Sequence, residues 1–389
     1  MKQSQKHKVS SNEQYFHKTD FLSFEDAIEN DLKQHKKHNK RTVEKLANTY
    51  GILNKNIIKE LTEFVIVKIA RAYAQNSSDY YAKYEKIVEL YKNQVNLSHR
   101  TSQSMLLQQY STPAPVAYIA SLYVSGVNTS LGSVKRGGKF TKNHFSFKPT
   151  YQPELKPEKH FFEPSAGNGL LTIALPMQNT IVNEIDDIRL RNLRKQDFEF
   201  VTNQDATDPF TDYYKKFDGV VTNPPFGTLI NAVNYDGYKI KTLDHLMALR
   251  ALDTMKDDGK AAIIIGGHTH WDDKGRIQAG KNRLFFNYLY SHYEVDDVVL
   301  LDGHKIYSKQ GTSFDVRLIL IDGRKLQVEG FAPLKNQKYS AIIRDFDDLW
   351  QRVFNAHSFP ETDNSKQKRI RIAKVKSSAK LKLLQIQAV

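Results

Sequence analysis

From residue 160 onward, short apolar runs alternate with segments whose apolar residues recur at helical spacing. Seven runs have the length and composition of buried β-strands, at residues 160–169, 180–186, 198–205, 217–225, 260–267, 295–303 and 315–323. Helical patterns separate several of them, at residues 187–196, 242–259 and 283–293. This alternation predicts an α/β fold, with a mostly parallel sheet covered by helices on both faces. The last two strands are joined without a helical pattern and should pair antiparallel.

The chain before this region has a helical pattern. Between residues 23 and 98, two apolar stripes repeat at helix spacing, and Asn54 or Asn56 is placed to cap the first helix. The stripes consist of Ile57, Leu61, Phe64, Val65 and Ile69, then Tyr80, Tyr84, Ile87, Val88 and Tyr91. They indicate a packed helical subdomain with a solvated, lysine-rich face more than a dedicated binding surface.

These patterns divide the chain into four predicted parts. Residues 1–22 are polar and basic, as in disordered segments. The helical subdomain follows at 23–98 and the α/β domain at 99–330, with a basic insertion at about 126–158. A small segment at 331–389 includes a basic tail after Asp363, which contains KQKRIRIAKVKSSAKLK and no acidic residue. This tail is either a solvated terminus or a contact for phosphates.

Charge and composition narrow the classes of partner and reaction. Lys and Arg outnumber Asp and Glu by 57 to 43, and the formal charge of +14 favours a polyanionic partner. The chain has no cysteine, which excludes disulfides, thiolate zinc sites and a cysteine nucleophile. No apolar run approaches the roughly 20 residues that span a bilayer, and the N-terminus lacks the apolar region of a signal peptide. We expect a soluble, cytoplasmic protein that does not contact membranes.

The first three strands of the α/β region end in residues that suit an adenosine cofactor. The loop EPSAGNG should lead from the first strand into a helix, and its Gly167 and Gly169 let the backbone approach a ligand, although an ordinary tight turn uses glycine too. Glu184 ends the second strand, where a carboxylate can accept both ribose hydroxyls, whereas the two aspartates that follow suit the start of a helix. Asp205 ends the third strand and can accept from an adenine amino group. Because parallel strands end at one edge, these side chains should form one polar site.

The fourth strand ends on the tetrapeptide Asn223-Pro224-Pro225-Phe226. The lone pair of an exocyclic amino nitrogen is delocalised into its ring, so the nitrogen is a poor nucleophile. An Asn oxygen and a main-chain carbonyl that accept its two N–H bonds would make it more tetrahedral and release the lone pair. The prolines hold these carbonyls rigidly, and Phe226 offers a stacking face for an extruded base. The alternative is a proline-terminated strand and turn.

Together these motifs resemble those of the S-adenosylmethionine-dependent amino-methyltransferases, most closely the DNA adenine-N6 methyltransferases, which include restriction-modification enzymes. The resemblance covers about Gln108 to Gly323. It implies a Rossmann-like class I methyltransferase sheet, mostly parallel with an antiparallel strand at the end, preceded here by the N-terminal helical subdomain. The Thr-Pro segment comes first, the cofactor motifs next and the catalytic motif last, which is similar to the gamma arrangement.

Residue roles follow from the same resemblance. Asn223, Pro224, Pro225 and Phe226 would form the catalytic motif, in which Asn223 and the Pro224 carbonyl hold the amino group. Thr112, in the segment QYSTP ahead of an apolar helix, would contact the methionine portion of S-adenosylmethionine. The other cofactor contacts would be Glu163, Pro164, Ala166, Gly167, Gly169, Glu184, Asp205, Ala206 and Asn223.

The resemblance implies methyl transfer by direct displacement to the N6 amino group of an extruded adenine in DNA. Structured RNA would use the same pocket, and a protein-glutamine N-methyltransferase or a non-catalytic nucleic-acid-binding partner subunit are further alternatives. Gamma-type enzymes usually carry a long C-terminal target-recognition domain, and here only about sixty residues follow the last predicted strand. The insertion at about 126–158 is either a DNA contact or a solvated loop.

The segment HTHWDD supplies side chains of the kind that bind metals. They are His268, His270, Asp272 and Asp273. Methyl transfer of this type needs no metal, and no further ligand is evident in the sequence. We therefore expect no metal and interpret the segment as a loop beside the target base.

Overall fold

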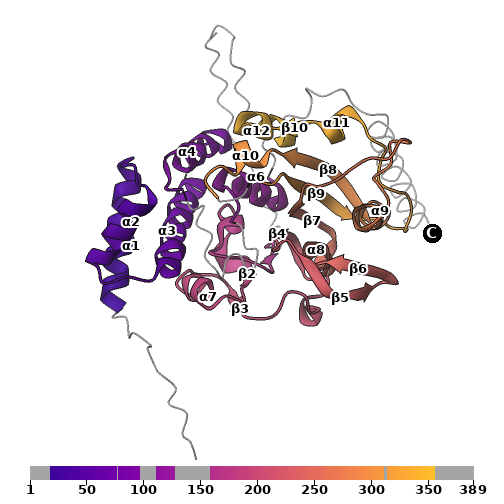
Figure 1. Ribbon diagram of the computed structural model, residues 1–389. Coiled ribbons are helices and arrows are strands. Elements are labelled where there is room, and N and C mark those ends of the chain that lie inside the picture. The colour runs from indigo at the N-terminus through magenta and orange to yellow at the C-terminus, as the bar shows by residue number, and fades with distance from the viewer. Residues whose placement is uncertain (1–17, 77, 97–110, 128–157, 311–312, 355–389) are drawn as a thin grey trace, which may run out of the picture.

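The computed structural model describes residues 18–76, 78–96, 111–127, 158–310 and 313–354. Its strands are β1 (Phe161–Glu163), β2 (Thr180–Asn183), β3 (Phe200–Thr202), β4 (Phe217–Thr222), β5 (Thr228–Tyr235), β6 (Tyr238–Thr242), β7 (Met255–Gly266), β8 (Tyr293–Leu301), β9 (Val316–Arg324) and β10 (Ile342–Ile343). Eight of them form one sheet in the order β10-β8-β9-β7-β4-β1-β2-β3 (Figure 1). β9 runs antiparallel to β7 and β8, and the other pairs in this sheet are parallel. The predicted fold class and the antiparallel pairing of the last two predicted strands are confirmed.

The described residues also form helices, which pack on both sides of this sheet and on one another. They are α1 (Lys18–Lys33), α2 (Lys40–Thr49), α3 (Lys55–Gln75), α4 (Tyr80–Asn93), α6 (Ala114–Ser125), α7 (Asp187–Leu193), α8 (Leu243–Asp253), α9 (Lys281–His292), α10 (Gly303–Ile306), α11 (Gln337–Ser340) and α12 (Phe346–Phe354). Asn54 caps α3 by accepting from the backbone N–H groups of Asn56 and Ile57. α1 already begins inside the segment predicted to be disordered, of which residues 1–17 lie outside the described part.

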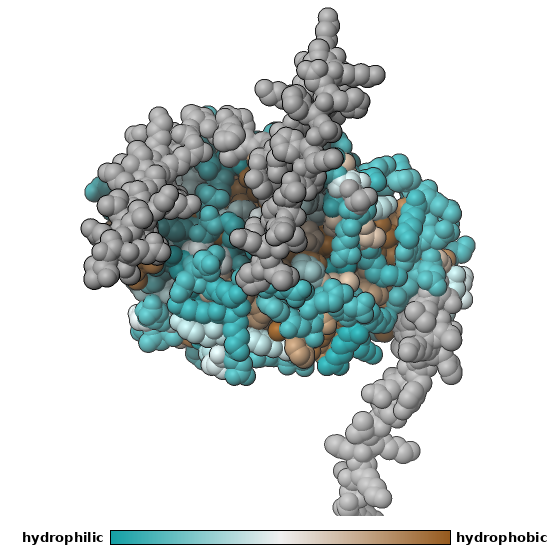
Figure 2. All heavy atoms as spheres, turned by 180° about the vertical axis from the view of Figure 1, so that it is seen from behind, coloured by the Kyte–Doolittle hydropathy of each residue, from teal (hydrophilic) through white to brown (hydrophobic). Residues whose placement is uncertain are grey.

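The sheet separates two hydrophobic clusters. Side chains of β9 alternate between them: Leu318 and Leu320 pack with α3, α4, α6 and α12, whereas Ile319 and Ile321 pack with α8 and α9. A strand that is buried on both faces reads as a continuous apolar run, which explains the segment DVRLILIDG. Seen from behind in Figure 2, the described surface is mostly hydrophilic, with smaller hydrophobic areas between.

The predicted boundaries at 98/99 and 330/331 do not interrupt the first cluster. It includes residues from α1 through α12. Tyr84 of α4 donates its hydroxyl to the Phe346 carbonyl at 2.7 Å, and the rings of Tyr84 and Trp350 lie 5.0 Å apart. The basic insertion and the basic tail fall almost wholly outside the described residues. None of the helices in the described ranges is long and apolar enough to cross a membrane.

Two local features differ from what the sequence predicted. The glycine loop after β1 opens onto a 3-10 turn, η2 (Leu170–Thr172), and not onto an α-helix. Pro176 follows too soon for a longer helix, and α6 packs against η2 and β4 instead. The second difference is an unpredicted hairpin, β5–β6, directly after the Asn-Pro-Pro-Phe segment. Its turn is Asp236-Gly237 with φ of 51° and 81°, the two positive values that a tight hairpin turn requires.

Helix α3 is buried nearly all round. It contacts α1, α2, α4, α6 and α7. Its buried residues include four charged ones, Lys59, Glu60, Glu63 and Arg71. A helix with no solvated face lies between layers, and the charged residues of α3 therefore need partners inside the protein. The partners of Glu60 and Arg71 lie mainly in the loop after β1 and in α7, whereas Glu63 accepts from Ser111, before α6.

Candidate active site

The order of the strands reverses at β1, because β2 and β3 lie on one side of it and β4 on the other. In parallel sheets the carboxyl ends of the strands leave a crevice at such a point. A cavity of about 380 Å³ opens there. Its walls come from the segments that follow β1, β2, β3 and β4, from α3, and from the residues just before α6.

The cavity brings together most of the residues predicted from the sequence. Its lining includes Thr112, Glu163, Pro164, Ala166, Gly167, Glu184, Asp205, Ala206, Asn223, Pro225 and Phe226. Pro224 is buried and does not line this cavity. Gly169 does not line it either, so the structure does not place this residue at a ligand surface.

The two glycines of the loop after β1 have different surroundings. Gly167 has φ of 57°, lines the cavity, and donates its N–H to Glu184 Oε2 at 2.7 Å. Gly169 has φ of 88°, and a Cβ added there would lie 3.2 Å from Phe198 and 3.3 Å from Leu193. Gly167 therefore shapes the cavity wall, and Gly169 allows close packing against α7.

Alanine substitutions should separate these two roles. Gly167→Ala should lower the free energy of unfolding by about 1–2 kcal/mol through backbone strain alone, because its Cβ would meet no atom within 4 Å. Gly169→Ala should lower it by at least about 1 kcal/mol more, since neighbouring side chains must also move. Urea unfolding of both variants measures the difference. Equal losses would contradict this assignment.

Asn183 ties the ends of three strands together. Its Nδ2 donates to the carbonyls of Pro164, at 2.9 Å, and Gln204, at 2.8 Å. Its Oδ1 accepts from the Gln204 N–H at 2.8 Å and from the Thr202 hydroxyl at 2.9 Å. The side chain thereby fixes the spacing between the loops after β1 and β3.

Glu184 is held rigidly at the end of β2. It is 4% exposed and accepts from the N–H groups of Gly167, at 2.7 Å, and Asp186, at 2.8 Å. Burial raises the pKa of Glu184, while Arg189 acts to lower it. Asp186 caps α7 through its side chain, as the helix-start interpretation of the sequence expected.

The Asn-Pro-Pro-Phe segment is joined to the residues before α6. Asn223 donates from Nδ2 to Thr112 Oγ1 at 2.9 Å. This bond fixes the orientation of the amide, because Oδ1 must then point away from the threonine. Phe226 is half-buried in the cavity wall and packs against the larger hydrophobic cluster. Next to them, the hydroxyls of Ser165 and Thr222 join the ends of β1 and β4 at 3.0 Å.

The cavity is acidic although the chain is basic. Four carboxylates line it, from Glu63, Glu163, Glu184 and Asp205, against one guanidinium, from Arg189. That guanidinium already binds Glu60 behind the wall, at 2.9 and 3.3 Å. The cavity therefore suits a cationic ligand.

Glu163 is the least satisfied of the four carboxylates. It is 1% exposed, and its Oε2 has no hydrogen-bond partner in the described part of the chain. Burial, and then the charge of Glu184, raise the pKa of Glu163 well above its usual range. A cation bound in the cavity would relieve both effects.

No protein-family profile matches the chain, and no curated protein sequence matches it. Among solved structures, the M protein of the type I restriction enzyme EcoKI is similar over 88% of this chain and 79% of its own, at 13% identity and a TM-score of 0.41. A Listeria monocytogenes protein assigned to the class I S-adenosylmethionine-dependent methyltransferases is similar over 76% of this chain and 98% of its own, at 11% identity and a TM-score of 0.38. The type IIG restriction endonuclease BpuSI is similar over 44% of this chain and only 23% of its own, at 14% identity and a TM-score of 0.33. These likenesses are remote and assign no function to this chain.

Several residues of the site escaped sequence analysis. Ser111, Asn183, Ile185 and Arg189 line the cavity, and so does Glu63 from α3. Two carboxylates three residues apart, at 60 and 63, within the apolar run of α3 were the available signal. Arg189 gave no signal, because an arginine in DIRLRNL resembles any solvated helix residue.

The segment HTHWDD does not assemble as metal ligands would. Within the described ranges, no group of three or more His, Cys, Asp or Glu side chains is placed to hold a metal ion. Asp272 instead pairs with Arg276 at 3.0 Å and Arg283 at 2.7 Å. His268 lies edge-on to Phe314, with ring centroids 5.9 Å apart.

Proposed function

We propose that the protein transfers a methyl group from S-adenosylmethionine to the N6 amino group of adenine in DNA. The observation that carries this proposal is the contact between Asn223 and Thr112 at the edge of an acidic cavity. It combines a rigidly oriented amide acceptor with a site that suits a cationic adenosine derivative.

The charge of the cavity supports S-adenosylmethionine over a phosphate-bearing cofactor. S-Adenosylmethionine carries a sulfonium and an ammonium group, and when bound it supplies an activated methyl group. A dinucleotide or nucleoside triphosphate would bring its phosphates close to four carboxylates. The Gly167 N–H, which could otherwise bind a phosphate, already donates to Glu184.

The strand ends provide groups for each part of the cofactor. Glu184 would accept from the ribose hydroxyls. Asp205 would accept from the adenine amino group through Oδ2, since its Oδ1 accepts from Thr207. Ile185 and Ala206 supply apolar surface in the same wall.

The Asn-Pro-Pro-Phe segment would act on the target base. The Oδ1 atom of Asn223 and the Pro224 carbonyl would accept the two N–H bonds of the amino group, and Phe226 would stack on the ring. Thr112 would act by fixing the amide of Asn223, in addition to the cofactor contact expected from the sequence. Catalysis would come mostly from positioning and from stabilising charge that develops on nitrogen.

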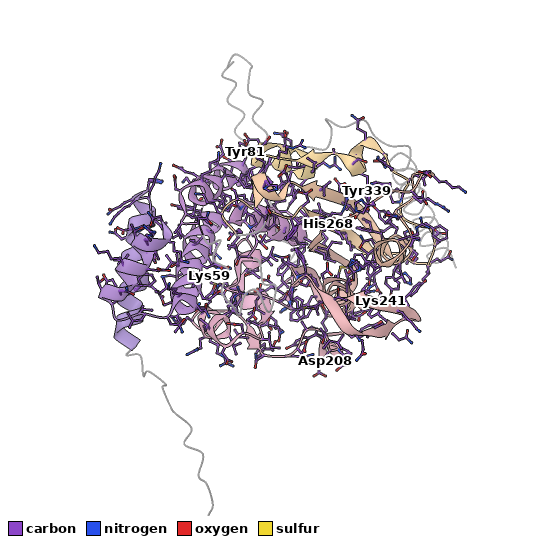
Figure 3. The ribbon with its side chains drawn as sticks, viewed as in Figure 1. Lys59, Tyr81, Asp208, Lys241, His268 and Tyr339 are labelled. Atoms are coloured by element: carbon purple, nitrogen blue, oxygen red, sulfur yellow. The ribbon has the colours of Figure 1, made fainter. Side chains whose placement is uncertain are left out.

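A nucleic-acid substrate is supported by the net charge of the chain and by exposed lysines on the hairpin next to the cavity. The hairpin that follows the Asn-Pro-Pro-Phe segment exposes Lys239 and Lys241. In Figure 3, Lys241 lies on this hairpin, on the opposite side of the molecule from Lys59 of α3. Lysines on a projecting hairpin suit contacts with phosphates. Structured RNA remains the second candidate substrate, because the net charge of +14 favours any polyanion.

One labelling experiment separates the candidate substrates. The protein is incubated with methyl-labelled S-adenosylmethionine and, in parallel, with duplex DNA, total RNA and a protein extract. We expect label in DNA alone. Label confined to RNA or to protein would overturn the DNA proposal, and cofactor binding without any transfer would favour a non-catalytic partner subunit.

Cofactor binding should depend on pH in a defined direction. Burial raises the pKa values of Glu163 and Glu184, so in the free protein these carboxyl groups lose their protons at a higher pH than ordinary carboxyl groups do. A cation binds the deprotonated form, and affinity for S-adenosylmethionine should therefore rise with pH until the carboxyl groups are ionised, then level off. Calorimetric titrations between about pH 5 and pH 7, below the pH range in which the ligand's own α-amino group titrates, measure this dependence. Affinity that falls over this range would contradict the acidic site.

A further inference from the structure

Glu63 lies in the middle of α3 and lines the cavity. It is 3% exposed and follows one turn after Glu60, which is also buried. Glu60 binds Arg189 at 2.9 Å, Lys59 at 3.6 Å and Asn168 at 2.8 Å. Among the described residues no lysine or arginine forms an ion pair with Glu63, whose Oε2 accepts only from the Ser111 hydroxyl, at 2.8 Å. Two neighbouring carboxylates of one helix thus have different partners.

Burying a carboxylate that no cation contacts costs free energy, and proteins keep such groups where a ligand completes them. A purely structural role is the simpler alternative, in which Glu63 only anchors Ser111. That role would be filled as well by a neutral amide, which accepts the same hydrogen bond without the penalty of a buried charge. The position of Glu63 at the cavity wall, with Glu60 already holding Arg189, favours a cationic partner that comes from the cavity.

The connections of Ser111 indicate which part of the ligand meets Glu63. Ser111 precedes Thr112, which holds the amide of Asn223 at 2.9 Å. Glu63 therefore lies next to the residues proposed for methyl transfer, whereas Asp205 follows β3, at the edge of the sheet. Besides the sulfonium that carries the transferable methyl group, S-adenosylmethionine has one further cation, the α-ammonium of the methionine portion.

We propose that Glu63 binds the α-ammonium group of the cofactor, with Ser111 holding the carboxylate in place. This inference rests on the proposed function and deepens it, because it makes the N-terminal helical part of the chain a wall of the cofactor site. Burial, and then the charge of Glu60, raise the pKa of Glu63. Arg189 and Lys59 act to lower it, and binding of the ammonium would lower it further, so a proton would leave wherever this carboxyl group is still protonated in the free protein.

Two ligands test the proposal. S-Adenosylmethionine carries the ammonium group, and 5′-methylthioadenosine shares the adenosine and the sulfur but lacks the amino-acid portion. Calorimetry on the full chain should show that Glu63→Gln weakens S-adenosylmethionine binding by roughly 10- to 100-fold, the factor for one lost hydrogen bond between charged groups. Binding of 5′-methylthioadenosine should change less than about threefold. Glu85→Gln on the exposed face of α4 makes the same chemical change away from the cavity and should alter neither affinity.

Repeating the titrations in buffers of different ionisation enthalpy measures the proton released on binding. Glu63→Gln should release less than the unaltered chain. Equal weakening of both ligands would assign Glu63 a structural role, and unchanged binding of both, or a selective loss in Glu163→Gln but not in Glu63→Gln, would overturn the proposal. If the unaltered chain binds neither ligand, it is the proposed function that fails. Glu63→Asp, which keeps the charge, should retain more affinity than Glu63→Gln.

Discussion

Replacing Asn223 by alanine should strongly lower the rate of methyl transfer while changing the affinity for the cofactor much less. The variant removes an acceptor proposed to hold the target amino group, and loss of one such preorganised group typically lowers kcat by at least about 100-fold. Cofactor affinity should change little, because the carboxylates of Glu63, Glu163 and Glu184 remain in the cavity wall. Single-turnover transfer to duplex DNA and calorimetric titration with S-adenosylmethionine measure the two quantities.

The control for this variant is Asn30→Ala. Asn30 lies exposed on α1 and bonds only to Gln34 in the described part of the chain, at 3.1 Å. It should retain full transfer activity. If Asn223→Ala also retained activity, the amide would not be the acceptor, and the proposed role of the Asn-Pro-Pro-Phe segment would be wrong. A parallel loss of cofactor binding would instead indicate that Asn223 shapes the cavity.

Removing Arg189 should destabilise the fold by about 3–5 kcal/mol, the loss expected when one partner of a buried ion pair is deleted. Arg189 is 6% exposed and binds both oxygens of Glu60, at 2.9 and 3.3 Å. Arg189→Met would leave Glu60 and Glu63 buried without this counter-charge. The free energy of unfolding in urea measures the loss.

Two further variants show whether the unpaired buried charge causes the loss of stability in Arg189→Met. The double variant Glu60→Leu with Arg189→Met removes both partners and should recover part of the loss, since apolar replacements of buried pairs are often neutral. Lys59 and Asn168 lose Glu60 as a partner, which limits the recovery. Arg276→Met breaks the exposed pair with Asp272 and should leave the free energy of unfolding nearly unchanged. A loss that the double variant does not recover would contradict the ion-pair explanation.

The Arg189 pair also gives stability a pH dependence. Burial acts to raise the pKa of Glu60, but Arg189 and Lys59 outweigh it and lower the pKa below its usual value of 4.5. The contribution of the pair is therefore present above about pH 4.5 and lost as the pH falls through the lowered pKa. In the Arg189→Met variant, the free energy of unfolding should therefore fall less on acidification than it does in the unaltered chain.

The sheet and the strand-end residues could be predicted because they depend on local patterns. Continuous apolar runs such as KAAIIIGG identify strands that are buried on both faces. The carboxyl ends of parallel strands lie at one edge of the sheet, so the sequence alone predicts that Glu184, Asp205 and Asn223 share a site. All three residues line the same cavity, and their roles toward the cofactor and the target base are proposals.

The contributions of α3 could not be predicted, because they depend on how distant parts of the chain pack. Arg71 donates to the Thr172 carbonyl at 2.8 Å and to the Gly169 carbonyl at 3.1 Å. Nothing near Arg71 in the sequence indicates that it holds a loop about a hundred residues away. The apolar stripe of α3 was visible, but the same stripe occurs in any helix that only packs. The β5–β6 hairpin differs, since its Asp-Gly turn was a readable signal.

The most direct measurement is mass spectrometry of nucleosides from duplex DNA incubated with the protein and S-adenosylmethionine that carries a deuterated methyl group. The proposed function predicts deuterated N6-methyladenine in the unaltered reaction and at least about 100-fold less after the same time with Asn223→Ala. Deuterium in a methylated cytosine, or binding of the cofactor with no methylated base in DNA, would contradict it.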